Sequence, residues 1–264
     1  INSYTPEVEI DFADIPFEEK FNLIQSYNNI LKSSDYIQTT RATYSDVHSH
    51  YTYINNEGSV LEFEKKYCGI SLNSIARDGS VIQPFHNSVA GHGGFEIVKG
   101  KEEVAEKVVK TAVDLLHAES VTGGNYNVIT DQKLSGVFIH EAFGHLSEAD
   151  FVHENKSLQN LMKLGETFGP PELNVIDDGT MSGLPGYIPF DDEGVLPQKT
   201  YLIKNGILNG RLHSRETAHK MNEELTGNGR AINVMRPPIV RMTNTYIDNG
   251  PCSKDELFES IDNG

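Results

Sequence analysis

Apolar residues near the start of the chain recur at helical spacing. Within residues 14–32 the spacings between them are 4, 3 and 7 residues, which follow one face of an α-helix. The four positions are Phe17, Phe21, Ile24 and Leu31. Pro16 lies just before them and suits the first turn of a helix. We therefore expect a helix over residues 14–32 that packs through these four side chains.

Between residues 36 and 97 the pattern changes to the alternation that is typical of β-strands. Short runs rich in Thr, Tyr, Val and Ile include residues 51–54 and 60–63. The segment between these two runs contains Asn55 and Gly58, which tolerate the positive φ angles of a hairpin turn. An antiparallel meander is therefore predicted.

A second amphipathic helix is predicted after the meander. Glu102 and Glu103 would lie in its first turn, where the helix dipole favours negative charge. Its apolar face consists of Val104, Val108, Ala112, Leu115 and Leu116. This face should cover the inner side of the meander. Because two consecutive glycines then interrupt the pattern, we divide the chain into a domain of residues 1–123 (helix, meander, helix) and a domain of residues 124–264.

The second domain contains an apolar stretch that leads into chemically active residues. Residues 136–139 (GVFI) run without a proline into residues 140–145 (HEAFGH), so this stretch can enter a buried helix. Strand-like runs follow at residues 200–203 and 207–212, and the Asn-Gly pair between them favours a type I′ hairpin turn. The expected fold class is α+β, an antiparallel sheet with packing helices followed by part of a β-rich domain that carries the histidine-containing helix.

The charge of the chain bears on its partners. The sequence has 38 acidic and 22 basic residues in 264, a formal net charge of −16. A field of this sign repels phosphate backbones, so direct binding of nucleic acid is not expected. No run approaches the roughly 18 consecutive apolar residues that predict a membrane-spanning helix, so we expect a soluble protein without a membrane partner.

Cysteine usage and the two ends of the chain give two further expectations. Cys68 and Cys252 have no CxxC spacing, so neither a disulfide framework nor a sulfur-rich zinc knuckle is expected. A reducing cytoplasm fits this usage best.

The chain begins with Ile rather than Met and ends just after a helix-like segment, so we expect it to be a fragment.

His140, Glu141 and His145 have the chemistry of a zinc site but not the commonest spacing. A catalytic zinc takes three protein ligands and leaves a fourth position for water, and neutral imidazole is a good ligand. Histidines four residues apart differ by roughly 40° around an α-helix, whereas a spacing of five separates them by about 140°, too far to share an ion. A π-bulge at residues 142–144, eased by Gly144, would return both rings to one side. Glu141 would then serve as general base on a zinc-activated water.

The spacing by itself also fits an ordinary segment. In that alternative one histidine satisfies a backbone carbonyl and the other packs against its neighbours. A chain with 10 histidines places some of them close together by chance. The HExxxH pattern alone is therefore a weak signal, and the wider sequence has to decide.

Three longer segments resemble the TldD/PmbA family of metallopeptidases. The first, residues 135–150, reads SGVFIHEAFGHLSEAD. The second, residues 187–206, contains YIPFDDEGVLPQKT and LIKNG, and the third, residues 242–247, reads MTNTYI. Together they extend over most of residues 123–250. The meander and its helices are compatible with the end of the family's amino-terminal domain but contain no motif of their own.

The resemblance implies zinc-dependent hydrolysis of peptide bonds in unfolded proteins or small peptides. It implies that zinc is held by His140, His145 and a cysteine from a Gly-rich segment far downstream, which is absent from this chain. Cys252 precedes a helix-like segment instead and is interpreted as a bystander. Residues 124–264 would be the first part of the catalytic domain, and the 264-residue chain alone should hold zinc weakly or not at all.

The family pairs an active subunit that carries HExxxH with a paralogue that lacks it. The resemblance therefore implies a peptide or unfolded-protein substrate, and a second subunit in a homo-oligomer or in a heterodimer with the paralogue. A non-catalytic scaffold or partner subunit is the alternative function, and the intact His140, Glu141 and His145 argue against it. A metal-dependent hydrolase with a non-peptide substrate stays open.

Other acidic residues and histidines are weaker candidates. Glu148, three residues after His145, is the candidate for a carboxylate that orients this imidazole, with a solvated helix face as the alternative. Asp150 and His153 also follow closely enough to reach the site. The acids of residues 191–193 would bind a substrate amine or a second cation, or else form an exposed turn. Four further histidines lack acidic or cysteine partners at ligand spacing and are interpreted as surface or packing residues: His48, His50, His86 and His92.

Overall fold

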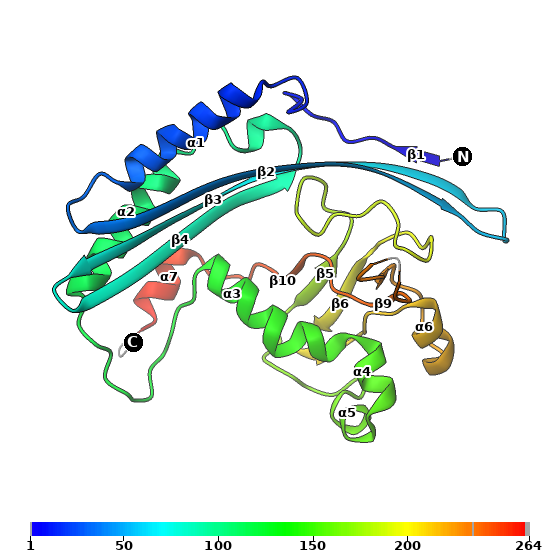
Figure 1. Ribbon diagram of the computed structural model, residues 1–264. Helices are drawn as coiled ribbons and strands as arrows, with labels where there is room; N and C mark the ends of the chain where they lie inside the picture. Colours follow the sequence, from blue (N-terminus) through cyan, green and yellow to red (C-terminus); the bar gives the residue numbers. More distant parts are fainter. Residues whose placement is uncertain (1, 234, 262–264) are drawn as a thin grey trace. The chain divides into compact units, whose positions relative to one another are not determined.

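The computed structural model describes residues 2–233 and 235–261 (Figure 1). The chain forms two compact units, each with its own hydrophobic core. The first consists of Ile1–Thr52 and Glu62–Gly123, and the second of Tyr53–Leu61 and Gly124–Gly264. Both units combine helices with β-sheets, so the expected α+β fold class is confirmed.

The first unit is built on a four-stranded sheet. Its strands are β1 (Asn2–Tyr4), β2 (Ile37–Ile54), β3 (Val60–Asp78) and β4 (Val81–His92). β3 pairs with each of the other three strands. Its pairing with β4 is antiparallel, with Cys68 opposite Gly91. The predicted meander is therefore confirmed.

Helices pack on this sheet and complete the core of the first unit. They are α1 (Phe17–Leu31), the 3-10 turn η1 (Phe95–Ile97) and α2 (Glu102–His117). α2 packs against β4, as predicted, and α1 packs against α2. On α2, Val108 and Ala112 are buried, whereas Leu115 is exposed, contrary to the predicted face. The largest core side chains include Tyr27, Leu31, Leu72 and Phe95.

α1 forms where the spacing predicts it, but its packing face is only partly as predicted. Phe17 is 81% exposed and Phe21 is 53% exposed, and their rings stack with centroids 6.2 Å apart. Tyr27 is fully buried, and its hydroxyl donates to the Val98 carbonyl at 2.7 Å and accepts from the Lys101 amide at 3.1 Å. A buried phenol needs such partners. These two bonds set the rotation of α1, so its buried face is centred on Tyr27.

The turn between β2 and β3 follows the prediction from its sequence. The side-chain oxygen of Asn55 accepts from the amides of Glu57 and Ser59 at 3.1 and 2.9 Å. Gly58 has a φ angle of 91°, which is unfavourable for residues with a Cβ atom. Gly58 therefore has the predicted positive φ angle. Asn55 does not have one and stabilises the turn through its side-chain oxygen instead.

The second unit consists of short elements. Its strands are β5 (Val175–Asp178), β6 (Lys199–Lys204), β7 (Ile207–Leu208), β8 (Gly229–Arg230), β9 (Ile239–Val240) and β10 (Thr245–Ile247). Its helical segments are α3 (Gln132–Ile139), η2 (His140–Gly144), η3 (His145–Ser147), α4 (Ala149–Glu154), α5 (Lys156–Leu161), α6 (Arg215–Met221) and α7 (Lys254–Glu259). One antiparallel sheet has the order β10-β5-β6-β7, and β8 pairs with β9 in another.

The hairpin between β6 and β7 has the predicted turn. Asn205 and Gly206 have φ angles of 51° and 77°, and a type I′ turn requires positive φ at both central residues. The second strand is shorter than the predicted run of residues 207–212, because β7 ends at Leu208.

Asp177 in β5 holds three segments of the second unit together. It is 1% exposed, and its carboxylate accepts from the amide and the hydroxyl of Thr243 at 2.8 and 2.7 Å. It also accepts from the Thr245 hydroxyl at 2.7 Å and from the side-chain amide of Asn228 at 2.9 Å. These bonds join β5 to β10 and to the segment that leads into β8.

Asp177→Ala is expected to lower the free energy of unfolding by at least about 3 kcal/mol. Several buried donors lose their acceptor, and each costs roughly 1–3 kcal/mol. Urea titration followed by circular dichroism measures the change. Glu172→Ala removes an exposed acid from the same unit and should change the value by less than about 0.5 kcal/mol. A loss for Asp177→Ala as small as that of the control would show that these bonds do not stabilise the unit.

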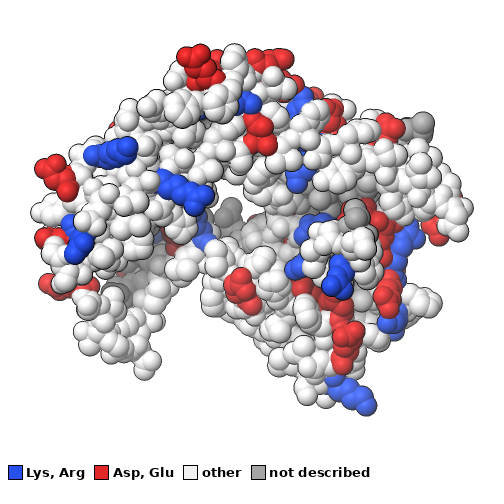
Figure 2. Space-filling view, viewed as in Figure 1, with Lys and Arg blue, Asp and Glu red and all other residues white. Residues whose placement is uncertain are grey.

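The surface carries charges of both signs. On the face shown in Figure 2, basic and acidic side chains are interspersed, and much of the face is uncharged. None of the described helices is long and apolar enough to cross a membrane.

Candidate metal centre

The helix that carries the two histidines changes its winding at the first of them. α3 begins after Asp131, whose carboxylate accepts from the Leu134 amide at 2.8 Å as an N-cap. η2 then forms one π-helical turn, and η3 tightens into a 3-10 turn. The π-bulge expected at residues 142–144 is therefore confirmed.

The π turn brings the two imidazoles onto one side of the helix. The ring centroids of His140 and His145 are 4.8 Å apart, and the ring planes are at 79° to each other. Glu141 lies beside them, with its Oε2 3.9 Å from Nε2 of His145. One ligand atom from each of the three residues lies within 4.8 Å of the others. Within residues 2–233 and 235–261, this is the one group of three or more His, Cys, Asp or Glu side chains that fits a metal ion.

The three side chains are accessible. The side chains of His145 and Glu141 are 39% and 67% exposed, and His140 is half-buried. An ion and a substrate can therefore reach the group from solvent. An ordinary packed segment would bury or separate the two rings, so the geometry favours a metal site over that alternative.

Glu148 is buried directly behind His145. It is 1% exposed, and its Oε2 lies 3.3 Å from Nδ1 of the imidazole. Burial raises the pKa of the Glu148 carboxyl, and the hydrogen bond with His145 opposes this shift. As a carboxylate, Glu148 accepts from Nδ1–H and leaves the lone pair of Nε2 available to an ion. Its Oε1 is buried without a hydrogen-bond partner in the described part of the chain.

The main chain explains why Glu148 points inward. Glu148 leaves the helical path with φ −70° and ψ 113° and forms a parallel bridge with Leu212. The Leu212 amide donates to the Ser147 carbonyl at 2.9 Å, and the Ala149 amide donates to the Leu212 carbonyl at 3.0 Å. The expectation of a solvated helix face at Glu148 is therefore wrong.

The remaining candidates near the motif lie outside the group. The carboxylate of Asp150 accepts from the amides of Val240 and Phe151 at 3.1 and 3.0 Å, so it fastens β9 to α4. His153 does not belong to the group of possible metal ligands among the described residues. The same holds for Cys68, which is buried in the first unit, and for Cys252, which is exposed.

In the acidic loop of residues 191–193, Asp192 is exposed, Glu193 is half-buried and Asp191 is buried. Asp191 is 2% exposed and accepts from three main-chain amides at 2.8–2.9 Å, including that of Gly229. Burial raises the pKa of this carboxyl, and the three amides oppose the shift. Asp192 and Glu193 each accept from a further amide, at 2.8 and 2.7 Å. Because the carboxylates hold the loop in place, the exposed-turn expectation is wrong for Asp191.

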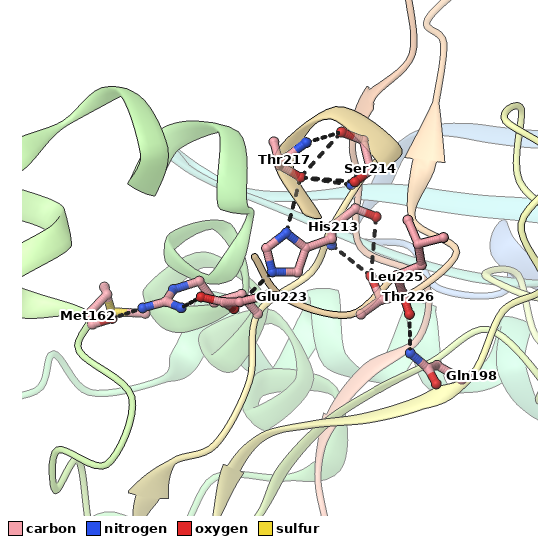
Figure 3. A network of polar contacts seen from close by, with 9 residues as sticks. Met162, Gln198, His213, Ser214, Thr217, Glu223, Leu225 and Thr226 are labelled. Atoms are coloured by element: carbon pink, nitrogen blue, oxygen red, sulfur yellow. Dashed lines mark hydrogen bonds and ion pairs between the residues drawn. The ribbon is translucent and has the colours of Figure 1, made fainter. Parts of the chain in front are cut away.

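A buried polar network around α6 was not predicted from the sequence (Figure 3). His213 is 1% exposed, with Nδ1 3.1 Å from the Thr217 hydroxyl and Nε2 3.0 Å from Oε2 of Glu223. Glu223 also pairs with Arg211, which donates to the Met162 carbonyl. Burial by itself raises the pKa of Glu223, but its bonds to His213 and Arg211 lower it below the ordinary value. The network ties α6 to the segments before and after it, so we interpret it as structural.

Among the described residues, the group of possible metal ligands includes none of the meander histidines. His48 is exposed and pairs with Glu64 at 2.6 Å. His92 packs edge-to-face against Tyr67, with ring centroids 5.6 Å apart. Their interpretation as surface or packing residues agrees with these contacts.

Two segments of the chain match known protein domains. Residues 123–264 match the PmbA/TldA metallopeptidase C-terminal domain, and residues 10–116 match the PmbA/TldA metallopeptidase central domain. A metalloprotease from Synechocystis sp. is 40% identical over 255 residues, which cover 96% of this chain and 55% of the relative. A zinc metalloprotease TldD homolog from Saccharolobus solfataricus is 32% identical over 257 residues, which cover 94% and 56%. The chain thus spans about half the length of the curated relatives it matches.

The fold also resembles that of a solved structure. A Thermotoga maritima protein described as a candidate modulator of a DNA gyrase superposes with a TM-score of 0.83. The superposition covers 97% of this chain and 57% of the other, at 23% sequence identity. At this identity the likeness shows a shared fold.

Proposed function

The chain belongs to the TldD/PmbA family of metallopeptidases, and from this we propose that it forms the zinc-binding part of a peptidase. In this proposal His140 and His145 are zinc ligands and Glu141 is the general base. The observation that carries it is the π turn, which gathers two imidazoles and a carboxylate within 4.8 Å. Nitrogen ligands from histidine suit zinc, and an exposed carboxylate beside them suits proton transfer.

The residues present fit part of a catalytic zinc site. Such a site takes three protein ligands and leaves one position open. The two imidazoles supply two ligands, and Glu148 fixes the orientation of the second through Nδ1. We propose that the third ligand comes from a segment beyond this chain, because the match covers only 55% of the Synechocystis relative. The identity of that ligand as a cysteine stays a prediction.

Glu141 has the central task in the proposed reaction. When bound, zinc would act as a Lewis acid and lower the pKa of the water that it holds to about 7. The Glu141 carboxylate takes a proton from the water that attacks the peptide carbonyl carbon. It then passes this proton to the amide nitrogen as the carbon–nitrogen bond breaks, so the products are a new carboxyl group and an amine. His145 keeps its orientation through the Glu148 hydrogen bond while this proton moves.

A peptide substrate is supported by the strand that lies beside the motif helix. β10 is an edge strand of its sheet, and α3 packs against it. Bonds from the Asp178 amide to the Asn244 carbonyl and from the Asp248 amide to the Asn174 carbonyl occupy one side of this segment. By alternation, the main-chain groups of Thr245 point to the other side. An extended, unfolded peptide could pair there beside the metal group.

The proposal is tested by the metal content of a chain extended to the length of its relatives. The unmodified protein should hold about one zinc per chain, and His140→Ala should lose it, because a ligand is removed. His153→Ala, which changes a nearby histidine outside the group, should keep the metal. In the same series, Glu148→Ala should weaken zinc binding by about 10- to 100-fold, and Glu148→Gln should weaken it less. Equal zinc in His140→Ala and the unmodified protein would overturn the proposal.

The partner subunit and the cytoplasmic location of this chain stay predictions. We propose a homo-oligomer or a heterodimer with a paralogous subunit as the functional assembly. Size-exclusion chromatography with light scattering measures the homo-oligomer directly, and co-expression with the paralogue measures the heterodimer. A chain that stays monomeric in both experiments would contradict this prediction.

A further inference from the structure

Gly144 lies in the π turn, directly before His145, and its neighbour across the fold is Met242. A Cβ atom at Gly144 would overlap Sδ of Met242 and lie 3.3 Å from its Cε. The φ and ψ angles of Gly144 are −56° and −50°, which any residue adopts in a helix. The expectation that Gly144 eases the distortion of the backbone is therefore wrong. Its missing side chain leaves room for the thioether of Met242.

Met242 is held firmly against this turn. It is 5% exposed and belongs to the core cluster that also contains Ile139 and Phe143 of the motif segment. Its carbonyl accepts from the Arg230 guanidinium. The next residue, Thr243, donates twice to Asp177 in β5, at 2.8 and 2.7 Å. The thioether therefore projects from a segment whose position is fixed at Met242 and at Thr243.

We propose that Met242 is a positioning residue for the metal ligands, and this inference rests on the proposed function. In this role its thioether supports the π turn from the inside and so keeps His140 and His145 on one side of the helix. A regular α-helix would separate the two rings by roughly 140°, so the pair depends on the turn keeping its winding. π turns are rare and need support from their surroundings. Methionine suits this task because its unbranched, polarisable side chain fills irregular gaps.

A buried methionine that only fills the core would predict a different result. Met162 offers the matched comparison, because it is 0% exposed and belongs to the same core cluster. A core filler affects the stability of the fold, whereas a positioning residue also affects the geometry of the bound metal.

The test is a set of variants in the chain extended to its relatives' length. Met242→Ala and Gly144→Ala should each weaken zinc binding by about 10- to 100-fold, the range found for residues that orient metal ligands. Met242→Leu, which nearly conserves volume, should stay within a few-fold of the unmodified protein. In the double variant the new methyl group partly fills the space left by the thioether. The fold-loss of zinc affinity in the double variant should therefore be smaller than the product of the fold-losses in the two single variants.

Three measurements decide whether Met242 positions the metal ligands or only fills the core. They are the zinc dissociation constant by chelator competition, the visible absorption spectrum of the cobalt-substituted protein, and the unfolding free energy. Met162→Ala should lower stability without changing zinc affinity or the cobalt spectrum. If Met242→Ala behaves in the same way as Met162→Ala, the inference is overturned.

A metal-free measurement separates this inference from the proposed function. Absence of zinc binding in the unmodified extended chain would contradict the proposed function. Amide hydrogen exchange of residues 140–146 in the metal-free protein would still test Met242, because local opening of the turn is measured directly. Met242→Ala should speed exchange there, and Met162→Ala should not. Equal exchange in the two variants would overturn the positioning role.

Discussion

Glu141→Gln is expected to abolish peptide cleavage and to leave zinc binding unchanged. The substitution keeps the size and the exposed position of the side chain but removes its ability to take a proton. A general base contributes about 10²- to 10⁴-fold to the rate of a reaction of this kind. Zinc should stay because His140 and His145 are the proposed ligands. A catalytic rate reduced by at least about 100-fold at full zinc content is the expected result.

The measurement combines a peptide-cleavage assay with metal analysis of the same sample of extended chain. Glu154→Gln is the matched control, because it changes an exposed acid of α4 close to the motif in sequence. The Glu154→Gln variant should keep both the rate of peptide cleavage and the zinc content of the unmodified protein. Loss of zinc in Glu141→Gln would make Glu141 a ligand, and full cleavage activity would place the base elsewhere.

The chemical centre could be predicted from the sequence because its residues are close together in the chain. A spacing of five between His140 and His145 excludes a shared ion in a regular helix, and the π turn is the local solution. The structure has this turn. Local turn chemistry was equally predictable, as the positive φ angles of Asn205 and Gly206 show.

Features that depend on distant partners were predicted less well. The helical period of α1 can be recognised in the sequence. The face that α1 buries, however, is set by bonds of the Tyr27 hydroxyl with the Val98 carbonyl and the Lys101 amide, more than 70 residues away. In the same way, the burial of Asp191 depends on the Gly229 amide, 38 residues later. Composition indicates an exposed acidic loop, but tertiary hydrogen bonds bury Asp191, while Asp192 stays exposed.

The surroundings of the metal group show the same limit. Glu148 was recognised by its distance from His145, but its burial depends on the bridge to Leu212. The fit between Gly144 and Met242 joins residues about a hundred positions apart, and neither residue type predicts the other. The network of His213 was missed for a related reason, because a lone histidine carries no signal until Glu223 is folded against it.

A chain extended to the length of its relatives is expected to bind zinc at least about a hundredfold more tightly than the 264-residue chain. Two imidazoles and a water leave a tetrahedral catalytic zinc one ligand short. Complete structural zinc sites contribute on the order of 10 to 16 kcal/mol, so the loss of one ligand of three weakens binding by orders of magnitude. The 264-residue chain should therefore be purified largely metal-free and inactive.

Competition with a chromophoric chelator measures both affinities, and the same samples are assayed for cleavage. An extended chain in which every cysteine beyond Gly264 is replaced by serine should fall to the affinity of the shorter chain. Cys252→Ser in the extended chain is the control and should keep its zinc, because Cys252 is exposed and outside the described metal group.

Chelator-resistant, stoichiometric zinc in the 264-residue chain would contradict this prediction and place the third ligand within residues 1–264. Glu148 would then be the first residue to examine, because its Oε1 is buried without a hydrogen-bond partner among the described residues and its other oxygen already contacts His145. Asp150 is less suited, since both of its oxygens accept from main-chain amides. Zinc held by Glu148 would release its bond to Nδ1, so Glu148→Gln would then lose the metal rather than retain most of its affinity.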